Sequence, residues 1–191
     1  MSQKTKNEEK LLEEKRSSSL EEVLKNALPY HFSNFEKFER QGIPFGMSGG
    51  DTGVPIEERM RANILIKFEV QAYINHLRRL KHHIIFLQKQ GKINLPTDKE
   101  LKQVWEDIML DDGVINLLAN KWAVHRSFDD PRGENLGSHL EILLNFEGTV
   151  TMWGNGHLFL SLGNHTFYLY HYHLKAMKFV DWFFTEVRKL K

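Results

Sequence analysis

The longest regular pattern in the sequence is a stripe of hydrophobic residues that recur every three or four positions between residues 55 and 89. Its members are Ile66, Val70, Tyr73, Leu77, Leu80, Ile84 and Leu87. This spacing places them on one face of an α-helix. Pro55 stands at a position that suits a first helical residue, and Glu57 and Glu58 suit the positive first turn. The pattern predicts one long helix over residues 55–89.

Two other segments of the first half repeat the helical period. Hydrophobic residues between 20 and 28 predict a short helix, which Pro29 closes because the residue before a proline disfavours helical geometry. Thr97 and Glu100 have the spacing of a capping box, in which each side chain satisfies a free backbone amide. We therefore expect a further helix over residues 97–109.

Two more helices are predicted towards the C-terminus, over residues 114–130 and 172–190. The second of these has a clean hydrophobic stripe, made of Ala176, Phe179, Val180, Phe183, Val187 and Leu190. The connection at residues 91–96 is short, and short connections join antiparallel neighbours in helical bundles. The helices are therefore expected to pack as an antiparallel bundle.

Between residues 139 and 163 the hydrophobic period changes from helical to alternating. Alternation over residues 140–146, 149–153 and 157–162 is typical of strands with one buried face. The run Gly-Asn-Gly at 154–156 is a strong hairpin signal. These segments predict a small antiparallel β-meander of about three strands.

The predicted elements indicate an α+β fold that is mainly helical. We expect an antiparallel helical bundle with the small antiparallel β-meander inserted before the C-terminal helix. Residues 1–19 alternate lysine and glutamate with few hydrophobic residues, which predicts a flexible charged tail. Residues 20–191 are expected to form a single domain with the meander at about 139–163, since the chain of 191 residues is hardly long enough for two.

Composition excludes several classes of function. The 26 basic residues nearly balance the 25 acidic ones, so nucleic acid would have to bind a local basic patch. One candidate is the basic run at residues 78–83, although such a run is usually a solvated helix face. The absence of cysteine excludes thiolate zinc sites and a cysteine nucleophile. No hydrophobic run is long enough for a membrane span, so we expect a cytoplasmic protein without a membrane partner.

Candidate chemistry lies at the end of the predicted helix over residues 114–130. Trp122 and His125 continue its hydrophobic stripe, and Lys121 stands four residues before His125, so both can reach one point. An imidazole at the mouth of a buried stripe can act as an acid or base near neutral pH. Alternatively, His125 is a core histidine that caps its own helix and bonds to Asp129 or Asp130.

The run Asn-Lys-Trp-Ala-Val-His-Arg-Ser at residues 120–127 resembles the signature region of HEPN domains. The resemblance covers roughly residues 55–130 and the last helix, and it implies a helical bundle, often dimeric, in a family with many ribonucleases and toxin components. The family motif is an arginine followed by a polar residue and, after four to six positions, a histidine. Asn120 and His125 match the last two, but Ala119 occupies the arginine's position. Lys121 cannot replace the arginine because it lacks the planar fork of donors.

Two hypotheses about function follow from these residues. The first is a HEPN-like module that binds RNA or a partner protein, with nuclease activity weak or absent; its resemblance implies a homodimer. Its candidate catalytic residues are His125, Lys121 and Asn120, and its candidate binding residues are Arg126, Asp129, Asp130 and Arg132. The alternative is a hydrolase or metalloprotein with a histidine and aspartate site between bundle and meander. That site would use His125, Asp129, Asp130 and His139 or His157.

No cofactor and no resident metal are expected. The sequence has 10 histidines, but no two of them have the i, i+4 spacing of a helical zinc site.

Overall fold

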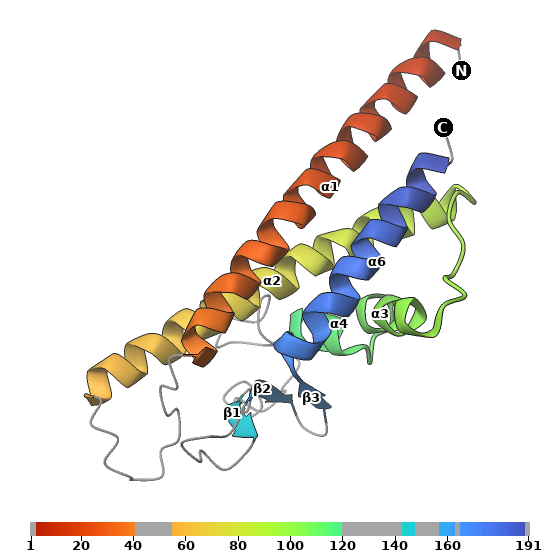
Figure 1. Cartoon of the computed structure of the whole chain (residues 1–191). Coiled ribbons are helices and arrows are strands. Elements are labelled where there is room, and N and C mark those ends of the chain that lie inside the picture. Colours follow the sequence, from red (N-terminus) through yellow and green to blue (C-terminus); the bar gives the residue numbers. More distant parts are fainter. Residues whose placement is uncertain (1–2, 41–54, 120–142, 148–156, 163–164, 190–191) are drawn as a thin grey trace, which may run out of the picture.

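The computed structural model describes residues 3–40, 55–119, 143–147, 157–162 and 165–189 (Figure 1). Its helices are α1 (Gln3–Arg40), α2 (Ile56–Lys89), α3 (Lys99–Met109), α4 (Val114–Leu118) and α6 (Leu169–Lys189). Its strands are β1 (Leu143–Glu147), β2 (His157–Leu162) and β3 (His165–Phe167).

Three long helices form the body of the molecule. Helix α1 packs against both α2 and α6, and it runs antiparallel to them (Figure 1). The shorter α3 packs on α6 and α2, and α4 packs on α3 and α2. The antiparallel helical bundle expected from the short connections is therefore present in the described part of the chain.

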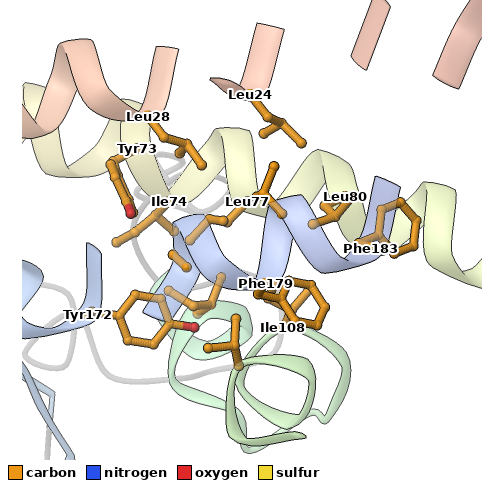
Figure 2. Packing of buried hydrophobic residues seen from close by; sticks show 14 of the residues in the cluster. Leu24, Leu28, Tyr73, Ile74, Leu77, Leu80, Ile108, Tyr172, Phe179 and Phe183 are labelled. Atoms are coloured by element: carbon orange, nitrogen blue, oxygen red, sulfur yellow. The ribbon is translucent and has the colours of Figure 1, made fainter. Parts of the chain in front are cut away.

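The hydrophobic core lies where these helices meet (Figure 2). The seven members of the α2 stripe are all buried, with exposed fractions of 0% or 1%. Leu24 and Leu28 of α1 approach the stripe from one side, and Phe179 and Phe183 of α6 from another (Figure 2). Burial of this stripe explains why residues 56–89 remain one helix, and the prediction for residues 55–89 is confirmed.

The predicted stop at Pro29 is wrong, because Pro29 lies inside α1. A proline in a helix removes one backbone hydrogen bond and usually breaks or kinks it. Here Leu28 and Phe35, on either side of the proline, are both buried in the core. Packing of this apolar face outweighs the lost hydrogen bond, so the helix continues to Arg40. Helix α1 also includes most of the segment predicted as a charged tail, whose flexibility stays a prediction.

The start of α3 differs by one residue from the predicted capping box. Its N-cap is Asp98, whose side chain accepts hydrogen bonds from the backbone amides of Glu100 and Leu101 at 3.0 Å each. A carboxylate satisfies two free amides in the positive first turn, which a threonine hydroxyl does less well. Helix α6 begins at Leu169, a few residues before the predicted start.

The assignment to the α+β class is wrong. Most of the described residues are helical, and no β-meander is found as a layer on the bundle in the part of the chain that the structure describes. Phe167 is the one strand residue whose burial the structure describes, and it lies in the core. A short alternating segment can pair as a strand without forming a layer over a helical bundle, and the described core residues come mainly from the helices.

What the structure has in this region are three short paired strands in the order β1-β2-β3, all antiparallel. In the predicted meander, the strand at residues 149–153 would lie between the strands at 140–146 and 157–162 and pair with both. Instead, β1 pairs directly with β2, with Asn145 opposite Phe159. Residues 149–153 and the predicted hairpin at 154–156 lie outside the described residues.

Candidate functional site

All site residues predicted from the helix end lie outside the described residues. They are Asn120, Lys121, His125, Arg126, Asp129, Asp130 and Arg132, together with His139 of the alternative hypothesis. His157 lies at the start of β2, but its side chain is not among those described. The structure therefore neither brings these residues together nor separates them. It does describe helix α4, which leads to these residues, and a basic strip on α2. Elsewhere in the bundle it describes three groups of side chains, of which the first lines a pocket.

Helix α4 leads directly to the signature region. It ends at Leu118, and Ala119 is the last described residue before Asn120. The position of α4 is fixed from α2, because Lys81 Nζ donates a hydrogen bond to Asn116 Oδ1 at 3.1 Å. Asn116 is buried, and a buried side-chain amide without a hydrogen bond would destabilise the fold. The bond from Lys81 satisfies its carbonyl oxygen.

A basic strip on α2 lies beside α4. Arg78, Lys81 and His82 are spaced by three and four residues, which places them on one side of the helix, and Arg79 is exposed next to them. Within the described part of the chain, no acidic side chain forms an ion pair with Arg78 or Arg79. Arg78 and Arg79 therefore carry positive charge that no carboxylate among the described residues neutralises.

A pocket of about 300 Å³ lies between α3, α4 and the first turns of α6. Asp107 and Val114 line it from the first two helices, Phe167 from β3, and His171, Tyr172 and Lys175 from α6. Asp107 is buried and accepts a hydrogen bond from Gln103 Nε2 at 3.0 Å. Burial raises the pKa of the Asp107 carboxyl above its ordinary range, while Gln103, Tyr172 and Lys175 oppose that rise.

Tyr172 places a polar group at the inner end of this pocket. Figure 2 shows its ring near Ile108, with the hydroxyl directed into the core. The hydroxyl is buried without a hydrogen-bond partner of normal geometry, although it is close enough to Asp107 to affect the pKa of that carboxyl. Burial, and then the charge of Asp107, raise the pKa of Tyr172 well above its ordinary value, so the phenol keeps its proton.

A second cluster joins α1, α2 and α6 around His173. Tyr73 and His173 share a buried hydrogen bond of 3.0 Å between the hydroxyl and Nδ1. Phe32 of α1 stacks on the imidazole with ring centroids 4.0 Å apart. Burial lowers the pKa of His173 to about 4, with Glu36 acting in the opposite direction. At neutral pH the imidazole is therefore uncharged, as its apolar surroundings require.

A third cluster lies on the α1–α2 interface. The Glu69 carboxylate of α2 is hydrogen-bonded to His31 Nδ1 at 2.7 Å. Its other oxygen accepts a hydrogen bond from the side-chain amide of Asn34 at 3.1 Å. His76 stacks on His31 with centroids 5.4 Å apart, and its Nδ1 is buried without a hydrogen-bond partner. Burial, then the charges of Arg79 and His31, lower the pKa of His76. This cluster holds the two helices together.

Neither the pocket nor the histidine clusters were predicted from the sequence. Asp107 and Tyr172 sit inside predicted helices, where hydrophobic spacing gives no sign that a polar atom is buried. A usable signal was Asp107 on the same face as Val104 and Ile108, because a carboxylate at a buried helical position needs partners.

Neither a metal centre nor a membrane span is indicated by the described residues. In the described ranges, no group of three or more histidine, aspartate or glutamate side chains is placed to hold a metal ion. None of the helices over those ranges is both long and apolar enough to cross a membrane. Comparison with known proteins finds no matching family model, no similar curated protein and no similar solved structure.

Proposed function

We propose that this protein is a HEPN-like helical module that binds RNA, with nuclease activity weak or absent. The observation that carries the proposal is the hydrogen bond from Lys81 to Asn116, since it holds the basic strip of α2 beside the helix that leads to the signature region. The strip supplies Arg78, Arg79 and Lys81, and the segment that follows α4 supplies Lys121, Arg126 and Arg132. Lysine and arginine side chains of this kind bind the phosphate backbone of nucleic acids.

Weak or absent cleavage follows from Ala119. This residue stands where the family motif has its arginine, and its exposed fraction is 0%. A guanidinium at this position would be taken out of water, which is costly without a paired anion. Without those donors, no group in the motif is left to stabilise the charge that develops on a scissile phosphate. His125 remains as a possible acid or base, with Asn120 and Lys121 beside it in the sequence.

Fluorescence anisotropy with a labelled single-stranded RNA tests the binding. Replacing both Arg78 and Arg79 by glutamine is expected to weaken binding about tenfold or more at roughly 0.1 M salt. The slope of log K against log salt concentration should become less steep by about 1 to 2. The matched control is the double replacement of Lys99 and Lys102 by glutamine, which removes two positive charges from exposed positions of α3. Unchanged affinity in the Arg78 and Arg79 variant, or no measurable binding by the wild type, would overturn the proposal.

A cleavage assay with the same RNA separates binding from catalysis. We expect little or no cleavage by the wild type. His125→Ala should change the affinity for RNA only slightly. Rapid cleavage that His125→Ala abolishes would show that the protein is an active nuclease in spite of Ala119.

A further inference from the structure

Two opposite charges flank the pocket between α3, α4 and α6 without forming an ion pair. Asp107 lines it from α3 and Lys175 from α6. The positive charge of Lys175 is close enough to lower the pKa of Asp107, yet the two side chains form no salt bridge in the described structure. Lys175 is exposed at the rim, while Asp107 is buried. The space between a buried negative group and an outer positive group is open to a ligand with both charges.

Hydrogen-bonding capacity remains unused at the inner end. The Tyr172 hydroxyl is buried and keeps its proton, and it forms no hydrogen bond of normal geometry with a described residue, although it lies close to the Asp107 carboxyl. Asp107 uses Oδ1 to accept from Gln103, which leaves its other oxygen as an acceptor. Buried polar groups are normally paired with good geometry, so this hydroxyl and carboxyl at the edge of a pocket point to a bound polar group that completes their hydrogen bonds.

The pocket also has an apolar side, while Tyr168 and His171 add polar groups to its lining. Val114 of α4 and Phe167 of β3 line the pocket, and Phe167 packs against the Tyr172 ring with centroids 5.0 Å apart. A ligand that fills about 300 Å³ next to these side chains would bury a hydrophobic group.

We infer that this pocket binds a small zwitterion, an α-amino acid with an apolar side chain. Its ammonium group lies towards Asp107, its carboxylate towards Lys175, and its side chain against Val114 and Phe167. A ligand with only a negative charge would meet the buried carboxylate of Asp107, and a ligand with only a positive charge would meet Lys175. The zwitterion alone satisfies both ends.

Isothermal titration with L-phenylalanine and L-leucine tests the inference on the full chain. Two analogues isolate the charges: 2-phenylethylamine lacks the carboxylate of phenylalanine, and 3-phenylpropanoate lacks the ammonium group. We expect saturable binding of at least one amino acid, and affinities for both analogues that are lower by about tenfold or more, because each loses one charged hydrogen bond. No saturation by either amino acid up to roughly 10 mM, or equal binding of an analogue, would overturn the inference.

Three variants assign the binding to this pocket. Asp107→Asn and Lys175→Gln should each weaken binding by about tenfold, and Tyr172→Phe should weaken it less because only one neutral hydroxyl is removed. Lys178→Gln is the matched control, since it removes the same charge from the same helix at a residue that pairs with Glu100 outside the pocket. Circular dichroism of each variant confirms that the helices are retained. Loss of binding in Lys178→Gln equal to that in Lys175→Gln would overturn the assignment.

Binding should also weaken on acidification, because the ammonium group needs an ionised Asp107. Among the described residues, Gln103 and Glu106 of α3 and Tyr172 and Lys175 of α6 act on this carboxyl, and His171 lines the same pocket. Since the pKa of Asp107 is raised, the loss should begin at a higher pH than for an ordinary aspartate, and it should be absent from Asp107→Asn. A pH profile shared by wild type and Asp107→Asn would show that Asp107 does not hold the ligand. The inference does not depend on RNA binding, which the Arg78 and Arg79 variant tests separately.

Discussion

The imidazole of His173 stays uncharged because three helices bury it. Tyr73 hydrogen-bonds its Nδ1, and Phe32 stacks on its ring. Charging this imidazole would place a cation among apolar side chains, with Glu36 as the acidic group that partly offsets the cost. His173 is thus a residue where packing of α1, α2 and α6 depends on protonation.

Acidification is therefore expected to destabilise the bundle through His173. Its pKa falls from the ordinary 6.5 to about 4 on folding, so between these values the unfolded chain binds the proton more tightly than the folded chain. The contribution is complete above about 6.5 and is lost as the pH falls towards 4, by at most about 3 kcal/mol. Urea unfolding across this range measures it.

His173→Gln is the control, because glutamine can still hydrogen-bond Tyr73 and does not titrate. The variant should lose a clear part of the wild-type dependence of stability on pH between 6.5 and about 4. Other acid-sensitive groups, including His76 with its lowered pKa, remain in both proteins and cancel in the comparison. Identical pH dependence of the two proteins would contradict the assignment.

At the scale of elements, helix α3 is set by its first turn. Asp98 accepts from two backbone amides, and Lys178 of α6 lies 3.8 Å from its other oxygen. The amide hydrogen bonds and Lys178 lower the pKa of Asp98, because both favour the carboxylate. This cap fixes where α3 starts, and so where Asp107 faces the pocket two to three turns later.

Replacing Asp98 by alanine should lower the melting temperature by about 2–4 °C, since the loss of an N-cap leaves two amides unsatisfied. Thr97→Ala is the matched control, because Thr97 is the cap that the sequence pattern predicted and the structure does not use. We expect Thr97→Ala to change the melting temperature little. A larger effect of Thr97→Ala than of Asp98→Ala, measured by thermal unfolding, would restore the predicted capping box.

Hydrophobic spacing predicts a helix correctly where burial of one face stabilises it. The period of the α2 stripe was enough to predict the helix over residues 55–89, because burial of one face is what makes that helix stable. Pro29 shows where local rules fail: the helix continues because Leu28 and Phe35 are buried by helices distant in sequence. The pocket could not be predicted for the same reason, since Asp107 and Lys175 meet only through the packing of α3 on α6.

At the scale of the whole molecule, the alternating pattern near residues 140–162 predicts a β-layer that the fold does not have. The described core residues come from the helices and from Phe167, the one strand residue whose burial the structure describes. Periodicity reports the local conformation of a segment, but whether that segment supplies a layer depends on how much apolar surface the helices leave uncovered. The candidate site at residues 120–132 stays a prediction, because it lies outside the described residues.

A candidate surface for the expected homodimer lies near the start of α2. Ile64, Leu65 and Phe68 have exposed fractions of 55%, 43% and 56% and lie within four residues of one another on the helix. The start of α2 also projects past α3 and α6 (Figure 1). Neighbouring exposed hydrophobic residues of this size are typical of interaction surfaces. We predict that a second copy of the chain covers them.

Sedimentation velocity over a range of concentrations measures the association. The wild type should sediment as a dimer at the higher concentrations, and Leu65→Lys combined with Phe68→Lys should sediment as a monomer, because each charge would be buried without a partner in the interface. Leu174→Lys is the matched control: Leu174 is a single exposed leucine of α6, with an exposed fraction of 76%, and lies on another helix. A wild type that stays monomeric at every concentration would leave these residues without a self-association role. A dimer that persists in the double variant would place the interface on another face of the bundle.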